Sequence, residues 1–338
     1  MTASKEKTIQ LSLIVPVYNR PAEIDELLKS LCEQTDRDFE VIIVEDGSTL
    51  RCEKEVNKYK IALNIIYLSK ENSGPGLSRN YGAERANGNY IIFLDSDCVL
   101  PPQYIQTVSS RLTEKHIDAF GGPDKADENF SVLQKSINYA MTSFLTTGGI
   151  RGGGEKLDKF YPRSFNMGYS REVFQKTGGF SGMRFGEDID MSIRIIKNGF
   201  KTKLIKEAYV YHKRRTHFRA FFKQVFNSGI ARINLYKRHP DSLKLVHTFP
   251  SLFLIGVVLM ILLSFFISPY FLTPLLLYTL MICIDSAIKN KSISVGFVSI
   301  VACYIQLCAY GAGFLSGYWK RVLFSKSEYS AFDDSFYD

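Results

Sequence analysis

The sequence predicts an α/β protein with a mostly parallel sheet, followed by a set of apolar helices. Four strand-like runs rich in β-branched and aromatic residues occupy the first hundred residues, at 11–18, 39–46, 63–69 and 89–95. Helical patterns lie between these runs, and such alternation is typical of parallel strands joined by crossover helices. The chain of 338 residues is long enough for one large domain and a smaller one.

The helices are predicted from the spacing of their apolar residues. PAEIDELLKSLCEQ has Pro21 in its first turn and apolar residues at i, i+3, i+4 and i+7, which is one helical face. A second helix is expected in LSRNYGAERANG, which Gly88 ends. A third is expected in FGEDIDMSIRIIKNG (185–199), because its first turn is acidic and Gly199 ends it.

Polar residues stand where three of the predicted strands end. Tyr18 and Asn19 follow the first strand, Asp46 ends the second, and Asp95 and Asp97 follow the fourth. Ligands of parallel sheets bind beyond the carboxyl ends of the strands. Two carboxylates so close together repel each other, and paired oxygen ligands suit Mg²⁺ or Mn²⁺ with a bound phosphate. A solvated turn at Asp95-Ser96-Asp97 is the alternative.

The middle of the chain gives fewer signals. GGIRGGGE (148–155) has five glycines in eight residues, so we expect a mobile loop there. Its spacing and context do not match a dinucleotide-binding fingerprint. The six cysteines form no C-x-x-C pair, which favours reduced thiols over disulfides or a zinc site.

A basic segment precedes the apolar runs. Eight Lys and Arg residues and no acid lie between Lys213 and His239. FRAFFKQVF (218–226) has aromatic residues on one face, which is typical of an interfacial helix, although a core-facing helix has the same pattern. These features favour an anionic membrane surface. Nucleic acid is the rival partner for a net charge of +8, but no reader motif is present, so no nucleic-acid partner is expected.

Three apolar runs, 249–268, 270–288 and 293–319, are each long enough to span ~30 Å of hydrocarbon. Lys289 and Lys291 lie between the second and third runs, and Lys320-Arg321 follow the third. The positive-inside rule would place both pairs in the cytoplasm, which three full crossings cannot do. Either the third run is re-entrant or interfacial, or the last charges are outside. The N-terminus lacks a secretory signal, so the first domain is expected to be cytoplasmic.

Four segments together resemble glycosyltransferase family 2. They are VPVYNRPAEIDELLKSLCEQT, VIIVEDGS, GPGLSRNYGAERANGNYIIFLDSD and GGFSGMRFGEDIDMSIRIIKNG, and they follow the order and spacing of the family over residues 10–212. The resemblance implies a GT-A fold, in which a Rossmann-like half that binds a nucleotide sugar is joined to an acceptor half. It also implies a transferase whose donor is a nucleotide sugar, expected to be a UDP-sugar.

The resemblance assigns roles to residues of the donor site. Pro16, Tyr18 and Asn19 would line the pocket of the nucleotide base, and Asp46 would hydrogen-bond the base. Arg79 would approach the ribose or the diphosphate, although a structural ion pair is an equal alternative for this arginine.

The resemblance also implies a metal site and a catalytic base. Asp97 would be the principal ligand of Mn²⁺ or Mg²⁺, with Asp95 nearer the ribose, and the metal would bridge the diphosphate. In some relatives a histidine at the position of His212 completes the metal site, although a structural histidine is the alternative. In the Glu187-Asp188 pair, Asp188 would take the proton from an acceptor hydroxyl, which attacks the anomeric carbon with inversion.

One family motif is absent. Processive members carry Q-x-x-R-W, whereas the only tryptophan here is Trp319, beyond the last apolar run. The enzyme is therefore expected to add one sugar, or very few, per encounter.

The expected domains are a GT-A domain at 1–212, a basic interfacial region at 213–245, a membrane domain at 246–320 and a polar tail at 321–338. The expected function is inverting transfer to a hydroxyl of a membrane-associated acceptor, in surface polysaccharide or glycolipid synthesis at the inner membrane. Two alternatives remain: transfer to polyprenyl phosphate, and a non-catalytic, membrane-tethered protein that binds a sugar nucleotide.

Overall fold

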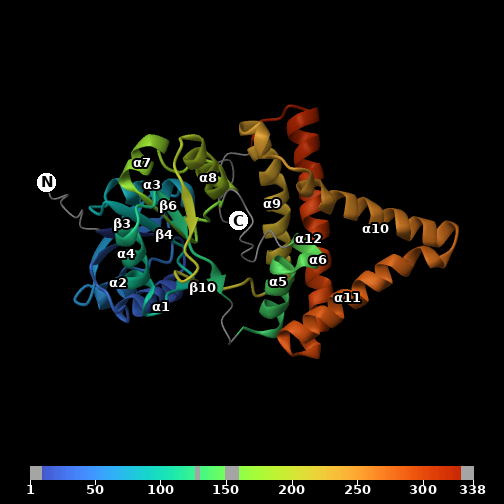
Figure 1. Ribbon diagram of the computed structural model, residues 1–338, viewed down its shortest axis with the longest axis horizontal. Helices are drawn as coiled ribbons and strands as arrows, with labels where there is room; N and C mark the ends of the chain where they lie inside the picture. The colour runs from blue at the N-terminus through green and yellow to red at the C-terminus, as the bar shows by residue number, and fades with distance from the viewer. Residues whose placement is uncertain (1–9, 126–129, 149–159, 329–338) are drawn as a thin grey trace. The chain divides into compact units, whose positions relative to one another are not determined.

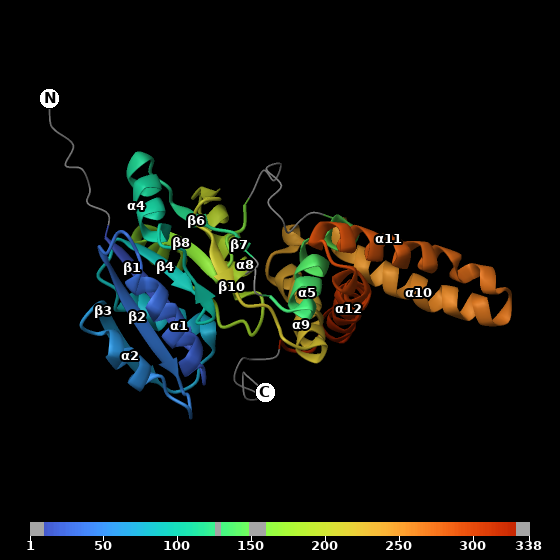
Figure 2. The same cartoon turned by 90° about the horizontal axis from the view of Figure 1, so that it is seen from below.

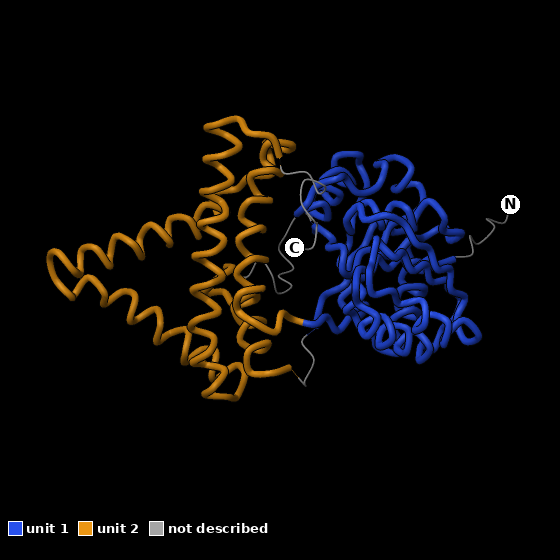
Figure 3. The backbone as a smooth tube through the Cα atoms, turned by 180° about the vertical axis from the view of Figure 1, so that it is seen from behind, with its two compact units in different colours: residues 1–125, 158–213, 329–338 blue, residues 126–157, 214–328 orange. Residues whose placement is uncertain are grey.

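The computed structural model describes residues 10–125, 130–148 and 160–328 (Figure 1). The predicted glycine-rich loop therefore lies outside the described residues, apart from Gly148. The chain divides into two compact units, coloured separately in Figure 3. Unit 1 comprises 1–125, 158–213 and 329–338, and unit 2 comprises 126–157 and 214–328. The sequence-based boundary at 212 places residues 130–148 in the first domain, whereas these described residues belong to unit 2.

Unit 1 is built on a seven-stranded sheet with the order β3-β2-β1-β4-β8-β6-β9. The strands are β1 (Leu11–Val17), β2 (Phe39–Asp46), β3 (Asn64–Lys70), β4 (Tyr90–Leu94), β6 (Ala119–Gly121), β8 (Asn166–Ser170) and β9 (Thr202–Leu204). The first four are parallel to one another, and β8 runs antiparallel to β4 and β6. This arrangement confirms the predicted parallel-rich α/β fold.

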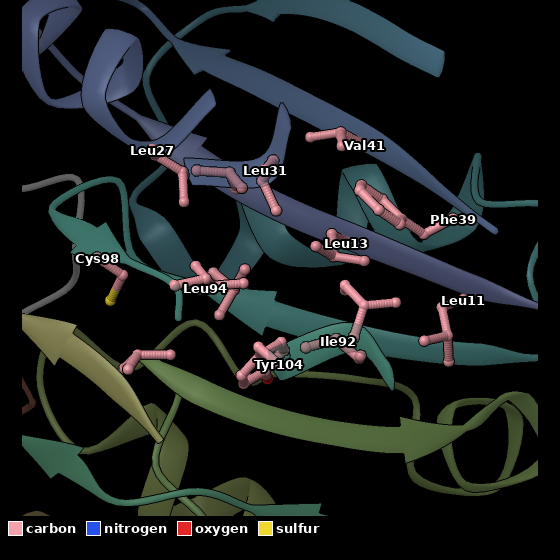
Figure 4. Close-up of a cluster of buried hydrophobic side chains, with 14 of the residues drawn as sticks. Leu11, Leu13, Leu27, Leu31, Phe39, Val41, Ile92, Leu94, Cys98 and Tyr104 are labelled. Carbon is pink, nitrogen blue, oxygen red and sulfur yellow. The ribbon is translucent and has the colours of Figure 1, made fainter. Parts of the chain in front are cut away.

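Helices cover both faces of the sheet, as Figures 1 and 2 show. They are α1 (Pro21–Cys32), α2 (Glu53–Tyr59), α3 (Pro75–Glu84), α4 (Tyr104–Glu114), α7 (Arg171–Thr177) and α8 (Glu187–Lys197). Successive side chains of a strand point to opposite faces, so Leu13 packs with α1, α2 and α4, while Ile14 packs with α3, α7 and α8. Figure 4 shows the first of these two cores, in which Leu27 and Tyr104 meet the strands. The sheet is therefore a rigid support for the residues at its edge.

A small second sheet lies in the same unit. It consists of β5 (Cys98–Val99), β10 (Val210–His212) and β7 (Asp124–Lys125), in the order β5-β10-β7. In its antiparallel β5–β10 pair, His212 lies opposite Cys98. Two segments more than a hundred residues apart in sequence are thereby joined.

Unit 2 is helical. Its elements are α5 (Val132–Thr142), α6 (Phe144–Thr147), α9 (Phe218–Arg238), α10 (Phe249–Phe266), α11 (Thr273–Asn290), α12 (Ile293–Tyr318), the 3₁₀ turns Pro240–Ser242, Leu245–Thr248 and Pro269–Leu272, and a π turn at Trp319–Leu323. Residues of α5, α9, α11 and α12 share one buried apolar core. Three helical segments, Leu245–Phe266, Pro269–Asn290 and Ile293–Leu323, are long and apolar enough to cross a membrane.

Candidate active site

The sheet order brings the predicted polar strand ends together. Strand β1 lies between β2 and β4, and all three are parallel. Asn19 after β1, Asp46 at the end of β2 and Asp95 after β4 consequently stand at one edge of the sheet. Pro16 is buried near the end of β1, and Tyr18 after it is half-buried. This edge is where a parallel sheet binds its ligand.

Asn19 fixes the loop that follows β2. It has a left-handed backbone (φ 53°), which asparagine tolerates better than most residues. Its side-chain oxygen accepts hydrogen bonds from the Leu50 N–H at 2.8 Å and from the Thr49 hydroxyl at 3.1 Å. Its own N–H donates to the Ser48 hydroxyl at 2.8 Å. The ends of β1 and β2 are thus bound into one wall of the site.

Asp46 is completely buried and fixes the loop before α3. Its carboxylate accepts hydrogen bonds from the backbone N–H groups of Ser73 and Gly74, each at 2.9 Å, and from the Lys70 ammonium at 2.6 Å. Because the side chain has no exposed surface, a contact between Asp46 and a nucleotide base requires this loop to move. Gly47 follows in a left-handed conformation, and a Cβ there would lie 2.7 Å from the Asn72 nitrogen.

A carboxylate and an imidazole approach each other beside β4. The β5–β10 pairing brings His212 Nε2 to 3.1 Å from Asp97 Oδ1 and to 3.9 Å from Asp95 Oδ2. The Phe165 ring stacks on the His212 ring with centroids 5.1 Å apart. Burial alone would raise the pKa of Asp97, but His212 and Arg20 hold that pKa well below its usual range.

These residues fit a divalent cation. Two ligands each ~2.1 Å from one metal at a right angle are about 3 Å apart, and Asp97 and His212 already have that spacing. Oxygen and imidazole donors together suit Mn²⁺. Cys98 Sγ lies within 4.8 Å of both ligand atoms, but burial raises the pKa of its thiol, which disfavours the thiolate form that binds metals.

Arg79 joins the end of β4 to the start of α8. Its guanidinium lies 2.7 Å from Asp95 Oδ1 and 3.2 Å from Glu187 Oε1, and the residue is 3% exposed. Both contacts are ion pairs within the protein. This is the arrangement that the sequence leaves open as the alternative to a ribose or diphosphate contact.

The first turn of α8 carries two adjacent carboxylates, the half-buried Glu187 and the buried Asp188, whose pKa values diverge. Asp188 Oδ2 lies 2.5 Å from Arg163 Nε, and its other oxygen accepts the Ile189 N–H at 2.7 Å. Burial would raise the pKa of Asp188, but Arg163 and the N–H group hold it below its usual value. Burial and the neighbouring Asp188 raise the pKa of Glu187 to about 7, despite Arg79. Asp188 is therefore the member of the pair that loses its proton at lower pH.

Known proteins with similar sequences decide the family. The family model "Glycosyl transferase family 2" matches residues 12–178. A Haemophilus influenzae protein named "Uncharacterized glycosyltransferase" is 32% identical over 210 residues, which are 60% of this chain and 67% of that protein. The chain is a family 2 glycosyltransferase. It is accordingly an enzyme whose donor is a nucleotide sugar.

Two further proteins are similar to this glycosyltransferase, one in part of its sequence and one in its fold. Poly(ribitol-phosphate) beta-N-acetylglucosaminyltransferase TarS of Staphylococcus aureus is 35% identical over 114 residues, so the chain covers 20% of that relative's length. A mannosyltransferase of Pyrobaculum calidifontis, solved with GDP-Man and Mn²⁺, superposes with a TM-score of 0.59 over 93% of this chain and 88% of that one. At 14% identity this likeness shows a shared fold.

Two arginines of the glycosyltransferase site carry no role in the sequence-based assignment. Arg20 Nη1 lies 2.8 Å from Asp97 Oδ2, and its position beside Asn19 in VYNRP is a signal that could have found it. Arg163 comes from the segment before β8, where no motif marks it. Only the fold shows that its guanidinium reaches Asp188.

Proposed function

We propose that the chain is a metal-dependent, inverting glycosyltransferase that moves one sugar from a UDP-sugar to a hydroxyl of a membrane-associated acceptor. The observation that carries this proposal is the buried carboxylate of Asp188, which Arg163 keeps ionised in the same unit as the Asp97–His212 pair. An ionised carboxylate can accept a proton, and a carboxylate beside an imidazole can hold a metal.

The donor site is proposed at the shared edge of β1, β2 and β4. Pro16, Tyr18 and Asn19 line the base pocket, and Asp46 contacts the base once the loop at 73–74 has moved. Asp95 contacts the ribose, and its ion pair with Arg79 fixes its position. Asp97 and His212, with Asp95, would hold the metal. A bound Mn²⁺ or Mg²⁺ would neutralise negative charge on the diphosphate of the donor.

The transfer step needs one base. The acceptor hydroxyl gives its proton to the carboxylate of Asp188, and its oxygen forms a bond to the anomeric carbon of the sugar. The bond from that carbon to the diphosphate breaks, and the nucleoside diphosphate leaves with the electron pair. A single displacement of this kind inverts the configuration and does not require the second carboxylate of a retaining enzyme.

The acceptor is proposed to be lipid-linked or membrane-associated, in surface polysaccharide or glycolipid synthesis. The three apolar helical segments support attachment to the inner membrane, with the catalytic unit on the cytoplasmic side. The proposed domains are 1–212 for catalysis, except for residues 130–148 of unit 2, then 213–245 for the basic interfacial region, 246–320 for the membrane and 321–338 for the tail.

The Asp188→Asn variant tests this proposal. We expect transfer to fall by roughly 10²–10⁴-fold, because the amide cannot accept the proton, while calorimetry shows nearly unchanged affinity for the UDP-sugar. Glu172→Gln is the matched control, because Glu172 is an exposed acid in the first turn of α7. Loss of donor binding in Asp188→Asn would contradict the role of Asp188 as the base.

Transfer to polyprenyl phosphate is a second candidate function. Arg163 supports it, because 38% of its side chain is exposed beside Asp188 and a guanidinium can bind a phosphate. A phosphate nucleophile is already an anion and needs little help from a base. Activity that survives in Asp188→Asn, measured with a polyprenyl phosphate acceptor, would favour this second function.

A further inference from the structure

The three apolar helices of unit 2 do not share one direction. Figures 1 and 2 show α10 and α11 leaving α12 sideways and meeting at a tip. A Cβ at Gly311 would lie 2.5 Å from the Pro250 carbonyl oxygen, so the start of α10 is packed against α12 at this glycine. A Cβ at Gly296 would lie 2.7 Å from the Cys283 carbonyl oxygen and 2.9 Å from the Ala287 Cβ, so the C-terminal half of α11 is packed against the start of α12.

Helices α10 and α11 form a hairpin, and the rise per residue of a helix gives its size. Gly296 and Gly311 are 15 residues apart on α12, which is about 22 Å. Each arm has 18 residues, which is about 27 Å. Because α11 already meets α12 at Cys283 and the Tyr304 hydroxyl of α12 reaches the Leu275 carbonyl, the tip at Pro269–Leu272 stands at most about 25 Å from the α12 axis. If the hairpin crosses a bilayer, α12 must lie close to the membrane plane.

The second observation is that α9 runs along the C-terminal half of α12. A Cβ at Gly313 would lie 2.0 Å from the Phe226 carbonyl oxygen. Further along both helices, Arg321 Nε donates to the Asn234 side-chain oxygen at 3.0 Å. Residue numbers increase together along this contact, so the two helices are parallel. Helix α5 covers the other half of α12, where the Ser136 hydroxyl donates to the Val295 carbonyl at 3.2 Å.

The composition of α9 is unsuited to hydrocarbon. Its 21 residues include five cations: Arg219, Lys223, Arg232, Lys237 and Arg238. If α12 crossed the bilayer, α9 would enter with it and carry these charges to membrane depth, which is costly. With α12 in the membrane plane, α9 lies at the headgroup level, where cations meet anionic lipid.

The α10–α11 hairpin, unlike α9, has a composition suited to hydrocarbon. No charged residue occurs from Phe249 to Ile284. Only 6% of the most apolar stretch of the first segment and 11% of that of the second are buried within the protein, against 39% for the third apolar segment. Exposed apolar side chains lie on both arms: Leu252, Ile255, Val258, Leu259, Leu276, Leu280 and Ile284. A tip at most about 25 Å from α12 is several Å short of the hydrocarbon thickness of ~30 Å, so the bilayer must be thinner around the hairpin, as it is around short spans.

We propose that the α10–α11 hairpin alone crosses the bilayer, while α12 lies in the plane of its cytoplasmic surface together with α5 and α9. The proposal rests on the membrane attachment proposed above, and the occupant of the exposed apolar surface is lipid. It also removes the conflict in the positive-inside rule. Lys289 and Lys291 at the hairpin base and Lys320-Arg321 after α12 are then on one side of the membrane.

Single cysteines and a membrane-impermeant maleimide test this arrangement. Tyr270→Cys marks the hairpin tip, where the tyrosine is 84% exposed. Lys291→Cys marks the turn before α12, and Lys326→Cys marks the chain after it. Labelling of the full chain in intact bacterial cells is measured above the parent, whose six cysteines are buried or half-buried. We expect Tyr270→Cys to react in intact cells, and the other two to react only after the membrane is permeabilised.

Three other results would contradict the proposal, each in a different way. Labelling of Lys291→Cys and Lys326→Cys from opposite sides would show that α12 crosses and would overturn the proposal. Tyr270→Cys protected together with Lys291→Cys would overturn the double crossing. Release of the chain by carbonate washing, as a soluble dimer, would identify a second copy as the occupant and would overturn both this proposal and the membrane attachment on which it rests.

Discussion

At the scale of the residue, the central contact is the ion pair between Arg163 and Asp188. Asp188 is buried beside Glu187 at the start of α8, and both conditions favour the protonated carboxyl. Arg163 opposes them and keeps the pKa of Asp188 below its ordinary value. The groups that face Asp188 are Arg163, Arg79, Glu187 and the Ile189 N–H. Of these, Arg163 is the strongest influence that favours the base form.

Arg163→Met is therefore expected to move the acid limb of the kcat/KM profile to higher pH. Without the guanidinium, burial and Glu187 raise the pKa of Asp188, so a larger fraction of the base is protonated at a given pH. If the acid limb moves up by one pH unit, kcat/KM at a given pH on that limb falls about tenfold. The loss of activity is therefore larger at pH 6 than at pH 8. The measurement is the pH dependence of sugar transfer in the variant and the parent.

Arg163→Lys is the conservative control, because an ammonium retains the charge that favours ionised Asp188 but lacks the geometry of the guanidinium. Its acid limb should lie between those of the parent and Arg163→Met. Equal losses at every pH in Arg163→Met would instead indicate a purely structural contact.

At the level of single residues, the sequence predicts only those positions that lie within recognisable motifs. Asp95 and Asp97 could be placed at a sheet edge because a buried strand ends just before them. The ion pairs of Arg79 could be stated only as an alternative, because Glu187 lies 108 residues away. Arg163 was not found at all, since its neighbours in sequence carry no pattern. Contacts between distant segments depend on the fold, and a single sequence does not show them.

At the scale of the element, α12 is the helix on which unit 2 is assembled. Gly313 allows the backbone of α9 to approach, and any Cβ there would meet the Phe226 carbonyl oxygen. Gly256 in α10 is the matched case, because its nearest neighbour is the Met260 methyl at 3.8 Å. The two glycines are both in apolar helices but differ in their surroundings.

Gly313→Leu is expected to destabilise unit 2 by about 1–3 kcal/mol or more, because the larger side chain must separate α9 from α12. Gly256→Leu should be neutral or slightly stabilising, since leucine is the better helix former by up to ~1 kcal/mol. Thermal unfolding of both variants in the same detergent is the comparison to make. Equal melting temperatures would contradict the close α9–α12 packing.

Elements were easier to predict than their orientations. The run at 89–95 became β4 at Tyr90–Leu94, and the segment at 185–199 became α8 at Glu187–Lys197. The periodicity of a helix shows its amphipathic face but not its partner. Thus the pattern at 218–226 predicts an interfacial helix and leaves a core-facing helix as the alternative. The structure gives α9 both a buried row that includes Phe221 and an exposed basic side with Arg219.

At the scale of the whole molecule, the chain has two units with separate cores. The strands and their covering helices form two apolar clusters in unit 1, and a third cluster lies entirely in unit 2. The proposed donor and metal ligands, including Asp46, Asp97 and His212, all lie in unit 1. The only tryptophan, Trp319, lies in unit 2. The fluorescence of this one residue therefore reports on the unit without the proposed ligands.

This distribution predicts that UDP and Mn²⁺ shift one unfolding transition but not the other. A ligand at 100 times its Kd stabilises the state that binds it by about 2.7 kcal/mol, which raises the melting temperature of a domain of this size by about 5–10 °C. Near-ultraviolet circular dichroism detects ordered tyrosines of both units, including Tyr104 and Tyr169 of unit 1, so the part of its transition that comes from unit 1 should show this increase. Tryptophan fluorescence should show an unchanged transition. In Asp97→Ala the part of the increase that depends on Mn²⁺ should disappear, while a ligand-dependent shift of the tryptophan transition in the parent would mean that the two units unfold together.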